Sequence, residues 1–381
     1  MGCNISKQEK RERMLWVDSL KGIGICGVVW VHVGGGELGN ILDSFGRAGA
    51  YWVEMFLILT VYLSCCSLAR REKQCTNFLN DSFRWLLERI WKLTPLYYLA
   101  LVVYLICIPS GVNIWLGSGE NKSRAINFLL HLCYLHDFFP YYANSITWVE
   151  WYIGVMVIYL VIIPVLFKYT KNCRNVKVLG GFLIILSLGI TCVFGCIHPC
   201  EDEYIWEGWI YTYSFIVHLP TLTYGIWLYV LRDMRINKVH SKIIFGVSIV
   251  MYMIIAWASD YYGNEFWVWI IRTMGFEVVF FMLILSGKIS DCLILNNRIW
   301  QIIGQNSYAI YLFHFLLVYI VGCLISDTAM ISVVRFPVAW KIIKFALVMA
   351  PCFAFSIVYE KHIGGKLYQW GQRKIFEFFV L

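Results

Sequence analysis

The chain has 381 residues, of which 60% are hydrophobic, 17% aromatic and only 15% charged, and its mean hydropathy is +0.65. This composition excludes an ordinary soluble domain and indicates a membrane protein. The formal net charge of +8 does not require a nucleic-acid partner, because basic loops at an anionic membrane surface account for it.

Ten segments are long and apolar enough to cross a hydrocarbon core about 30 Å thick, which predicts an all-α, polytopic transmembrane bundle. An eleventh stretch, 126–136, is too short and is expected at the membrane interface. The expected regions are an N-terminal segment over 1–14, a transmembrane domain over 15–360 and a tail over 361–381. The predicted spans lie near residues 15–34, 50–68, 93–109, 149–167, 178–197, 209–230, 243–258, 267–286, 303–325 and 339–359.

Basic residues are unevenly divided between the two sets of connecting segments. If the N-terminus is cytoplasmic, the segments on that side hold 24 of the 32 Lys and Arg residues, and the opposite segments hold four. The positive-inside rule therefore predicts that both termini are cytoplasmic and that the protein crosses the plasma membrane many times. The polar N-terminus has no cleavable signal pattern, so the first span is expected to direct insertion.

The first span contains two titratable side chains, Lys21 and His32, which are costly in hydrocarbon and often functional there. They are eleven residues apart, so they share one helix face and are separated by roughly 16 Å along its axis. A glycine run at 34–36 is expected to end the helix, and His32 could then act as a general base. Other readings remain open: His32 bonds a neighbouring helix, and Lys21 snorkels or pairs with Asp18.

The connection at 110–148 is aromatic and contains histidines, which predicts an ordered cap over a cavity. Glu54 and Glu150, near the outer ends of the second and fourth spans, are at a depth that would allow them near His32. No Cys or His cluster has the spacing of metal ligands, so no metal is expected. Cys196 and Cys200 could form a disulfide if the outer side is oxidising.

A basic pair, Arg89 and Lys92, precedes the third span and lies one helical turn apart. Such a pair suits a phosphate-bearing ligand, because Arg grips phosphate with a fork and Lys with a point charge. The alternative is ordinary positive-inside anchoring.

The ninth span contains His314, with Ser307 and Tyr311 on the same helix face. This polar stripe is expected to face the bundle interior. The remaining intramembrane polar side chains, His218, Arg272 and Glu277, are expected to pair with other helices or to line a site.

Five segments, in this order, resemble motifs of the integral-membrane acyltransferase family 3, which includes O-acetyltransferases of bacterial surface glycans. The resemblance runs from residue 17 to about 325. The five segments are VDSLKGIGICGVVWVH, GAYWVEMFLILTVYLS, RIWKLTPLYYLAL, ITWVEWYIGVMVIYLVIIP and IGQNSYAIYLFH.

The resemblance implies that Lys21 and His32 form the essential motif, that Arg89 and Lys92 hold an acyl-coenzyme A donor, and that His314 is a secondary polar contributor. It implies transfer of an acyl group, acetyl above all, from acetyl-coenzyme A to a sugar hydroxyl of a cell-surface or lipid-linked glycan. His32 would be either a general base or a transient acyl carrier.

Two positions depart from the family pattern. Thr60-Val61 replaces the Ser-Gly of many members, which would alter a close helix contact, and Met156 replaces a glutamate of some members.

Two other function classes remain open. A transporter or flippase of lipid-linked saccharides also needs many spans and buried basic residues, although no internal repeat supports one. A non-enzymatic subunit or membrane sensor would not need intact Lys21, His32, Arg89 and Lys92. Transfer of labelled acetyl groups, lost in His32→Ala, distinguishes the enzyme from both.

Overall fold

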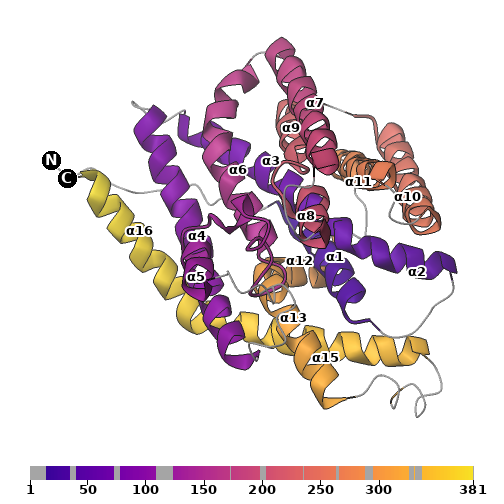
Figure 1. Ribbon diagram of the computed structural model, residues 1–381. Coiled ribbons are helices and arrows are strands. Elements are labelled where there is room, and N and C mark those ends of the chain that lie inside the picture. The colour runs from indigo at the N-terminus through magenta and orange to yellow at the C-terminus, as the bar shows by residue number, and fades with distance from the viewer. Residues whose placement is uncertain are drawn as a thin grey trace.

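The computed structural model describes residues 14–34, 40–72, 78–108, 123–171, 173–197, 203–234, 236–262, 266–287, 295–325, 330 and 337–380. Every regular element within these ranges is a helix (Figure 1), which confirms the predicted all-α class.

The bundle is built from long α-helices joined by short 3-10 and π segments. The α-helices are α1 (Leu15–His32), α2 (Asn40–Arg47), α3 (Trp52–Glu72), α4 (Phe78–Cys107), α5 (Arg124–Leu132), α6 (Trp151–Phe167), α7 (Cys173–Ile197), α8 (Glu203–Gly208), α9 (Leu219–Val230), α10 (Lys238–Tyr261), α11 (Phe266–Gly287), α12 (Arg298–Gln305), α13 (Ser307–Leu324), α15 (Pro337–Tyr359) and α16 (Gly365–Val380). The shorter segments are η1 (Ala48–Tyr51), η3 (His136–Phe138), η4 (Lys168–Lys171), η5 (Trp209–Tyr213), η6 (Leu231–Asp233) and η7 (Glu360–Gly364).

Eight of the helices in the described ranges are long and apolar enough to cross a membrane, and they overlap eight of the ten predicted spans. The first predicted span is the 18-residue α1, which carries Asp18 and Lys21. The predicted span at 303–325 begins as a separate helix, α12, and the long helix α13 starts only at Ser307. The stretch at 126–136 contains the nine-residue α5, which is too short to span.

The predicted span at 209–230 is not one helix. A π-helical turn, η5, ends at an extended Ser214, and α9 begins only at Leu219. Pro220 lies in the first turn of α9, where it has no N–H with which to continue a helix from the preceding residues. The Thr221 hydroxyl donates to the His218 carbonyl oxygen (2.7 Å) and stabilises this start. The break leaves irregular backbone at membrane depth, which proteins tolerate where it lines a cavity.

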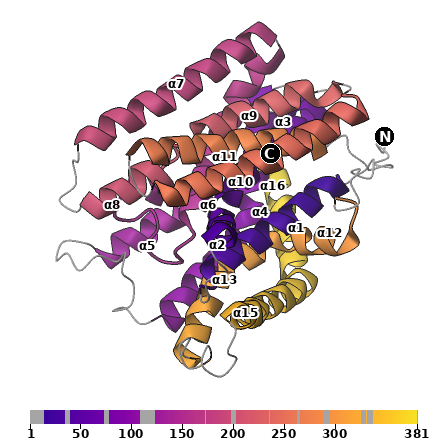
Figure 2. The same ribbon diagram turned by 90° about the vertical axis from the view of Figure 1, so that its right-hand side faces the viewer.

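Helix α1 packs against α3, α12 and α13 and lies beside α12 (Figure 2). A Cβ atom on Gly304 would overlap the carbonyl oxygen of Asp18, and one on Gly22 would overlap that of Trp300. The Ser19 hydroxyl also donates to the Leu295 carbonyl oxygen (2.6 Å). The two glycines therefore fix where α1 sits against α12.

Gly304→Ala is expected to destabilise the protein by at least about 1–3 kcal/mol, because the added methyl group meets rigid backbone. Gly181→Ala in α7 is the matched control: nothing lies within 4 Å of its added Cβ, and alanine favours helix over glycine. Thermal unfolding of the two purified variants measures the difference. Equal unfolding temperatures would contradict the close α1–α12 contact.

Thr60-Val61, which stands where the family pattern has Ser-Gly, lies opposite a glycine on a neighbouring helix. The side chain of Val61 in α3 packs where a Cβ on Gly225 of α9 would lie. The two helices therefore still approach closely, with the small residue on α9.

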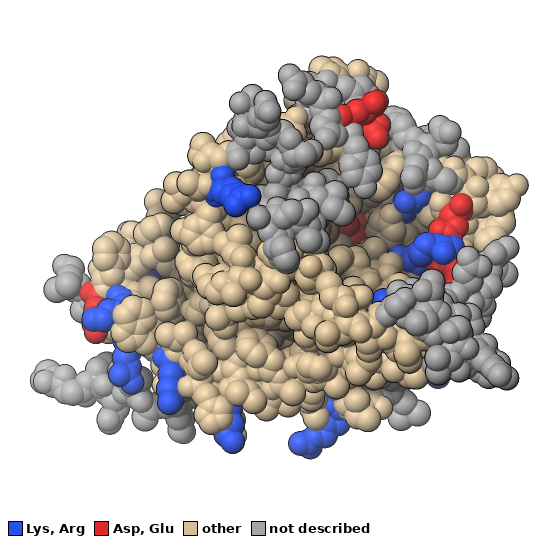
Figure 3. All heavy atoms as spheres, turned by 60° about the horizontal axis from the view of Figure 1, so that its bottom comes forward, with Lys and Arg blue, Asp and Glu red and all other residues tan. Residues whose placement is uncertain are grey.

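Large apolar side chains cover much of the outer surface, among them Ile106, Ile185 and Leu324, which are 77%, 70% and 78% exposed. In Figure 3 charged residues lie mostly toward the margins of a broad face of other residue types. An apolar surface of this extent is expected of a protein surrounded by lipid.

The predicted tail over 361–381 continues α15 through the π-helical turn η7 into α16. Helix α16 lies beside α4 (Figure 1), and the Trp91 indole donates to the Leu367 carbonyl oxygen (3.0 Å). The tail is therefore a docked helix.

Candidate functional site

Among the described residues, most of the predicted site residues line two cavities. We call the larger one, about 750 Å³, the basic cavity, because Lys21, Arg89 and Lys92 line it. We call the other, about 510 Å³, the histidine cavity, because His32 and His218 line it. Lys21 and His32 thus lie in different cavities while belonging to one helix, α1.

The basic cavity collects its three cations from α1 and α4. Arg89 and Lys92 are one turn apart on α4, and the Arg89 guanidinium lies 5.5 Å from the centre of the Trp85 ring. Arg84, on the same helix, instead donates to Glu88 (3.1 Å), which also pairs with Arg71. The cavity lining includes Arg89 and Lys92 but not Arg84, as the sequence spacing predicts.

The break between α12 and α13 also faces the basic cavity. Gln305, Asn306, Ser307 and Tyr308 line it at the point where the 18-residue α13 begins. The first N–H groups of a helix are unpaired within it and carry the positive end of its dipole. The cavity therefore combines three side-chain cations and a helix N-terminus with the carboxyl groups of Asp18 and Glu360, and the excess of positive charge suits phosphate groups.

In the histidine cavity, His32 ends α1, and Gly34 follows with φ +57°, the left-handed conformation that commonly terminates a helix. The predicted helix end is thus confirmed, although residues 35 and 36 lie outside the described ranges. The His32 ring is half-buried, lies 4.3 Å from the Phe315 ring and has no hydrogen-bond partner within the described residues. Its nitrogens are available to a ligand.

His314 lies directly behind His32, with ring centres 5.3 Å apart. Its Nδ1 lies 2.7 Å from the Tyr311 carbonyl oxygen, which can only accept, so Nδ1 carries the proton. Its buried Nε2 is left as a lone pair without a partner among the described residues. His314 does not line either cavity, but it faces the bundle interior as predicted.

Tyr311 lines both cavities, so the two cavities adjoin at this side chain. Its hydroxyl donates to the Val149 carbonyl oxygen (2.8 Å), and its ring packs edge-on against Tyr152 with centres 5.1 Å apart. The predicted stripe on α13 therefore runs from the basic cavity at Ser307, through Tyr311, to His314 beside His32.

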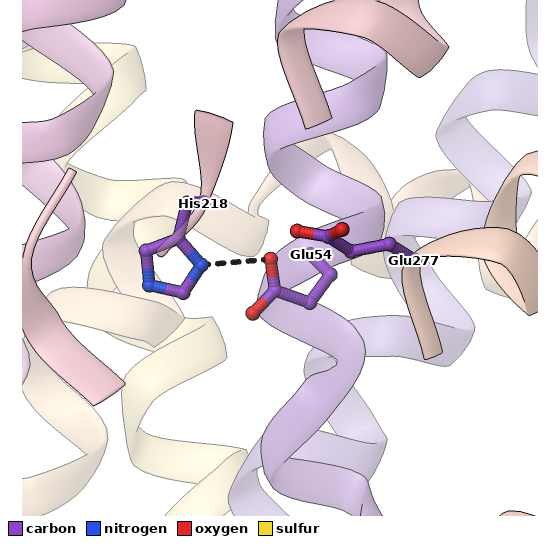
Figure 4. Close-up of side chains that lie close together, drawn as sticks. All are labelled: Glu54, His218 and Glu277. Carbon is purple, nitrogen blue, oxygen red and sulfur yellow. Dashed lines mark hydrogen bonds and ion pairs between the residues drawn. The ribbon is translucent and has the colours of Figure 1, made fainter. Parts of the chain in front are cut away.

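The carboxylate of Glu54 in α3 lines the histidine cavity, as the sequence-based depth argument allows. Its Oε2 lies 3.0 Å from Nδ1 of His218, and both side chains are 2% exposed (Figure 4). His218 reaches this position because the helix breaks before α9. The sequence marks His218 as an intramembrane polar residue but does not pair it with Glu54.

Glu150 has a different position. It lies outside both cavity linings and accepts hydrogen bonds from the backbone N–H groups of Ile146, Thr147 (2.9 Å) and Val149 (3.1 Å). Burial alone would raise the pKa of this carboxyl group, but the adjacent His131 ring and the Ile146 N–H lower it to about 2. Glu150 is therefore an anionic anchor for the loop.

That loop holds Trp148 in a left-handed conformation, φ +63°, which is strained for an aromatic residue. Trp148 and Asn144 line the histidine cavity, so the described part of the predicted connection, 123–148, does border a cavity, while residues 110–122 lie outside the described ranges. The loop is also tied to the broken segment, because the Trp209 indole donates to the Asp137 carbonyl oxygen (2.7 Å). Burial raises the pKa of the Asp137 side chain to about 8.

Comparison with known proteins gives one match. A family model described as an acyltransferase domain matches residues 14–360, nearly the whole chain. No curated protein and no solved structure matches significantly.

Proposed function

The chain belongs to this acyltransferase family and has many spans, and on that premise we propose that it transfers an acyl group, specifically acetyl, from acyl-coenzyme A to a sugar hydroxyl of a cell-surface or lipid-linked glycan. Its site of action would be the plasma membrane.

The observation that carries this proposal is that the basic and histidine cavities meet at one side chain, Tyr311. A donor held by its phosphates at Lys21, Arg89 and Lys92 has a long pantetheine arm that can extend toward Tyr311. An acceptor hydroxyl beside His32 would then meet the thioester near Tyr311, where the two cavities adjoin. The anionic donor would occupy the basic cavity, and the sugar acceptor would occupy the histidine cavity.

In the simplest form of the reaction, His32 removes the proton from the sugar hydroxyl as its oxygen attacks the thioester carbonyl carbon. The C–O bond forms, the C–S bond breaks, and the imidazolium returns the proton to the coenzyme A thiolate. The products are the acetyl ester and free coenzyme A. In the alternative form, His32 takes the acetyl group itself and passes it to the hydroxyl.

The other predicted residues have supporting roles in this proposal. Ser307 lies at the donor end of the stripe on α13, and His314 packs against His32 and positions its ring. Glu54 acts on the acceptor side through its contact with His218. Glu150 holds the loop that places Trp148 in the lining of the histidine cavity.

The test uses the purified, detergent-solubilised protein with radiolabelled acetyl-coenzyme A and glycans extracted from cells in which the gene is deleted. Label is expected to appear in the glycan as a base-labile ester. If no label transfers, while the protein in vesicles moves lipid-linked saccharides across the bilayer, the transporter alternative replaces the proposal.

A further inference from the structure

A second chemical centre lies at the side of the histidine cavity. Glu54 of α3, His218 before α9 and Glu277 of α11 meet there, and one ligand atom from each lies within 4.8 Å of the others (Figure 4). Glu277 points at Glu54 from the opposite helix. All three side chains are buried, and Glu277 is 0% exposed.

Both carboxylate oxygens of Glu277 lack a hydrogen-bond partner among the described residues. Burying a carboxyl group without partners costs several kcal/mol, and a buried charge costs more. Arg272, on the same helix, donates to the Tyr51 hydroxyl (3.3 Å) and the Ser259 carbonyl oxygen (3.1 Å). The described residues therefore supply no hydrogen-bond donor to the Glu277 carboxylate.

The contacts of His218 are compatible with a metal ligand. Its Nε2 lies 2.9 Å from the Thr212 carbonyl oxygen, which can only accept, so Nε2 must donate. In the neutral ring Nδ1 is then a lone pair, yet it faces the Glu54 carboxylate at 3.0 Å. Two acceptors at this distance need either a proton or a metal ion between them, and a metal ion would also neutralise Glu277. Metal-bound histidines usually donate their other N–H to a carbonyl or carboxylate in this way.

We propose that Glu54, His218 and Glu277 bind one divalent metal ion, with Zn²⁺ as the ion that fits best. Two carboxylates and a neutral imidazole balance its charge, leaving the buried centre neutral. An imidazole ligand disfavours Mg²⁺ and Ca²⁺, which prefer oxygen ligands, and three protein ligands with one open position are typical of zinc in enzymes. Glu54 and His218 line the histidine cavity and Glu277 does not, so the open position is on the cavity side.

The test is metal analysis of the full-length protein, purified without chelators, equilibrated with Zn²⁺ and freed of excess ion. About one Zn²⁺ per wild-type chain is expected. Glu277→Gln and His218→Gln are each expected to weaken Zn²⁺ binding by more than roughly 10–100-fold, the usual cost of losing a group that only hydrogen-bonds a metal ligand. Loading with Co²⁺ gives a second readout, because its visible absorption reports ligand geometry and is expected to disappear in the same variants.

His131→Gln is the matched control, because His131 Nε2 also lies beside a buried carboxylate, Glu150 (3.4 Å), but in another part of the fold. It should retain the metal. Each variant is compared as a single, monodisperse species, so loss of metal is not confused with unfolding.

The alternative is that protons neutralise the cluster. A wild-type protein that holds no Zn²⁺ after loading overturns the proposal. So does an infrared band of a protonated carboxyl group, present in the Zn²⁺-treated wild type and lost in Glu277→Gln. Metal content does not depend on acyl transfer, so this inference and the proposed function succeed or fail separately.

Discussion

Replacing His32 with alanine is expected to lower acetyl transfer by about 10²- to 10⁴-fold, the usual contribution of a general acid-base group. The reason is local: His32 is half-buried at the end of α1, lines the histidine cavity and has no competing partner among the described residues. Its loss removes the proton acceptor without removing donor contacts. The measurement is kcat with labelled acetyl-coenzyme A, and the KM for the donor should stay nearly constant.

His240→Ala is the matched control, since His240 is an exposed histidine on α10, outside both cavity linings. It should leave transfer unchanged. Retained transfer in a folded His32→Ala protein would remove His32 from the reaction.

A labelling experiment on the wild type separates the two roles proposed for His32. If His32 carries the acetyl group, the wild type incubated with labelled donor and no acceptor should retain label on the protein, and the peptide containing His32 should hold it. If His32 is a base, no label is retained and only the complete mixture reacts.

The second large effect is expected at the donor end. Arg89→Ala and Lys92→Ala should each raise the KM for acetyl-coenzyme A by roughly 10- to 100-fold, because hydrogen bonds to charged groups are worth about 1.5–3 kcal/mol. The effect should fall mainly on KM, since phosphate contacts remote from the thioester bind ground state and transition state equally. Steady-state kinetics over a range of donor concentrations measure it.

Arg84→Ala is the control on the same helix, because Arg84 pairs with Glu88 and does not line the basic cavity. Its KM should change little. An acetyl-pantetheine donor, which lacks the nucleotide phosphates, should react equally well with the wild type and the Arg89 and Lys92 variants. If the variants remain impaired with this donor, they do not act by gripping phosphate.

Helix α1 illustrates what could be predicted from local pattern. The spacing of Lys21 and His32 on one face, the glycine end at Gly34 and the separation in depth all follow from helix geometry, and each side chain lines a cavity. The stripe of Ser307, Tyr311 and His314 was predictable for the same reason.

The break before α9 could not be predicted in the same way. Residues 209–230 contain no Asp, Glu, Lys or Arg and read as one span, and Pro220 alone does not tell whether a helix bends or stops. The stop depends on the loop, whose Asp137 side chain accepts from the Phe215 N–H (3.0 Å). The depth of Glu150 in its predicted span likewise allowed it near His32. In the structure its carboxylate instead accepts hydrogen bonds from backbone N–H groups of its own loop.

Hydropathy, charge bias and helical period determined from the sequence alone that this is a helical membrane protein and that the polar stripe of α13 faces its interior, and the order of its motifs indicated the acyltransferase family. Those properties depend on neighbours within a few turns. Tertiary structure decided that Tyr311 lines two adjoining cavities and that Glu54, His218 and Glu277 form one cluster. These residues come from three separate segments, and their meeting depends on how helices far apart in the chain pack, which no spacing along the sequence encodes.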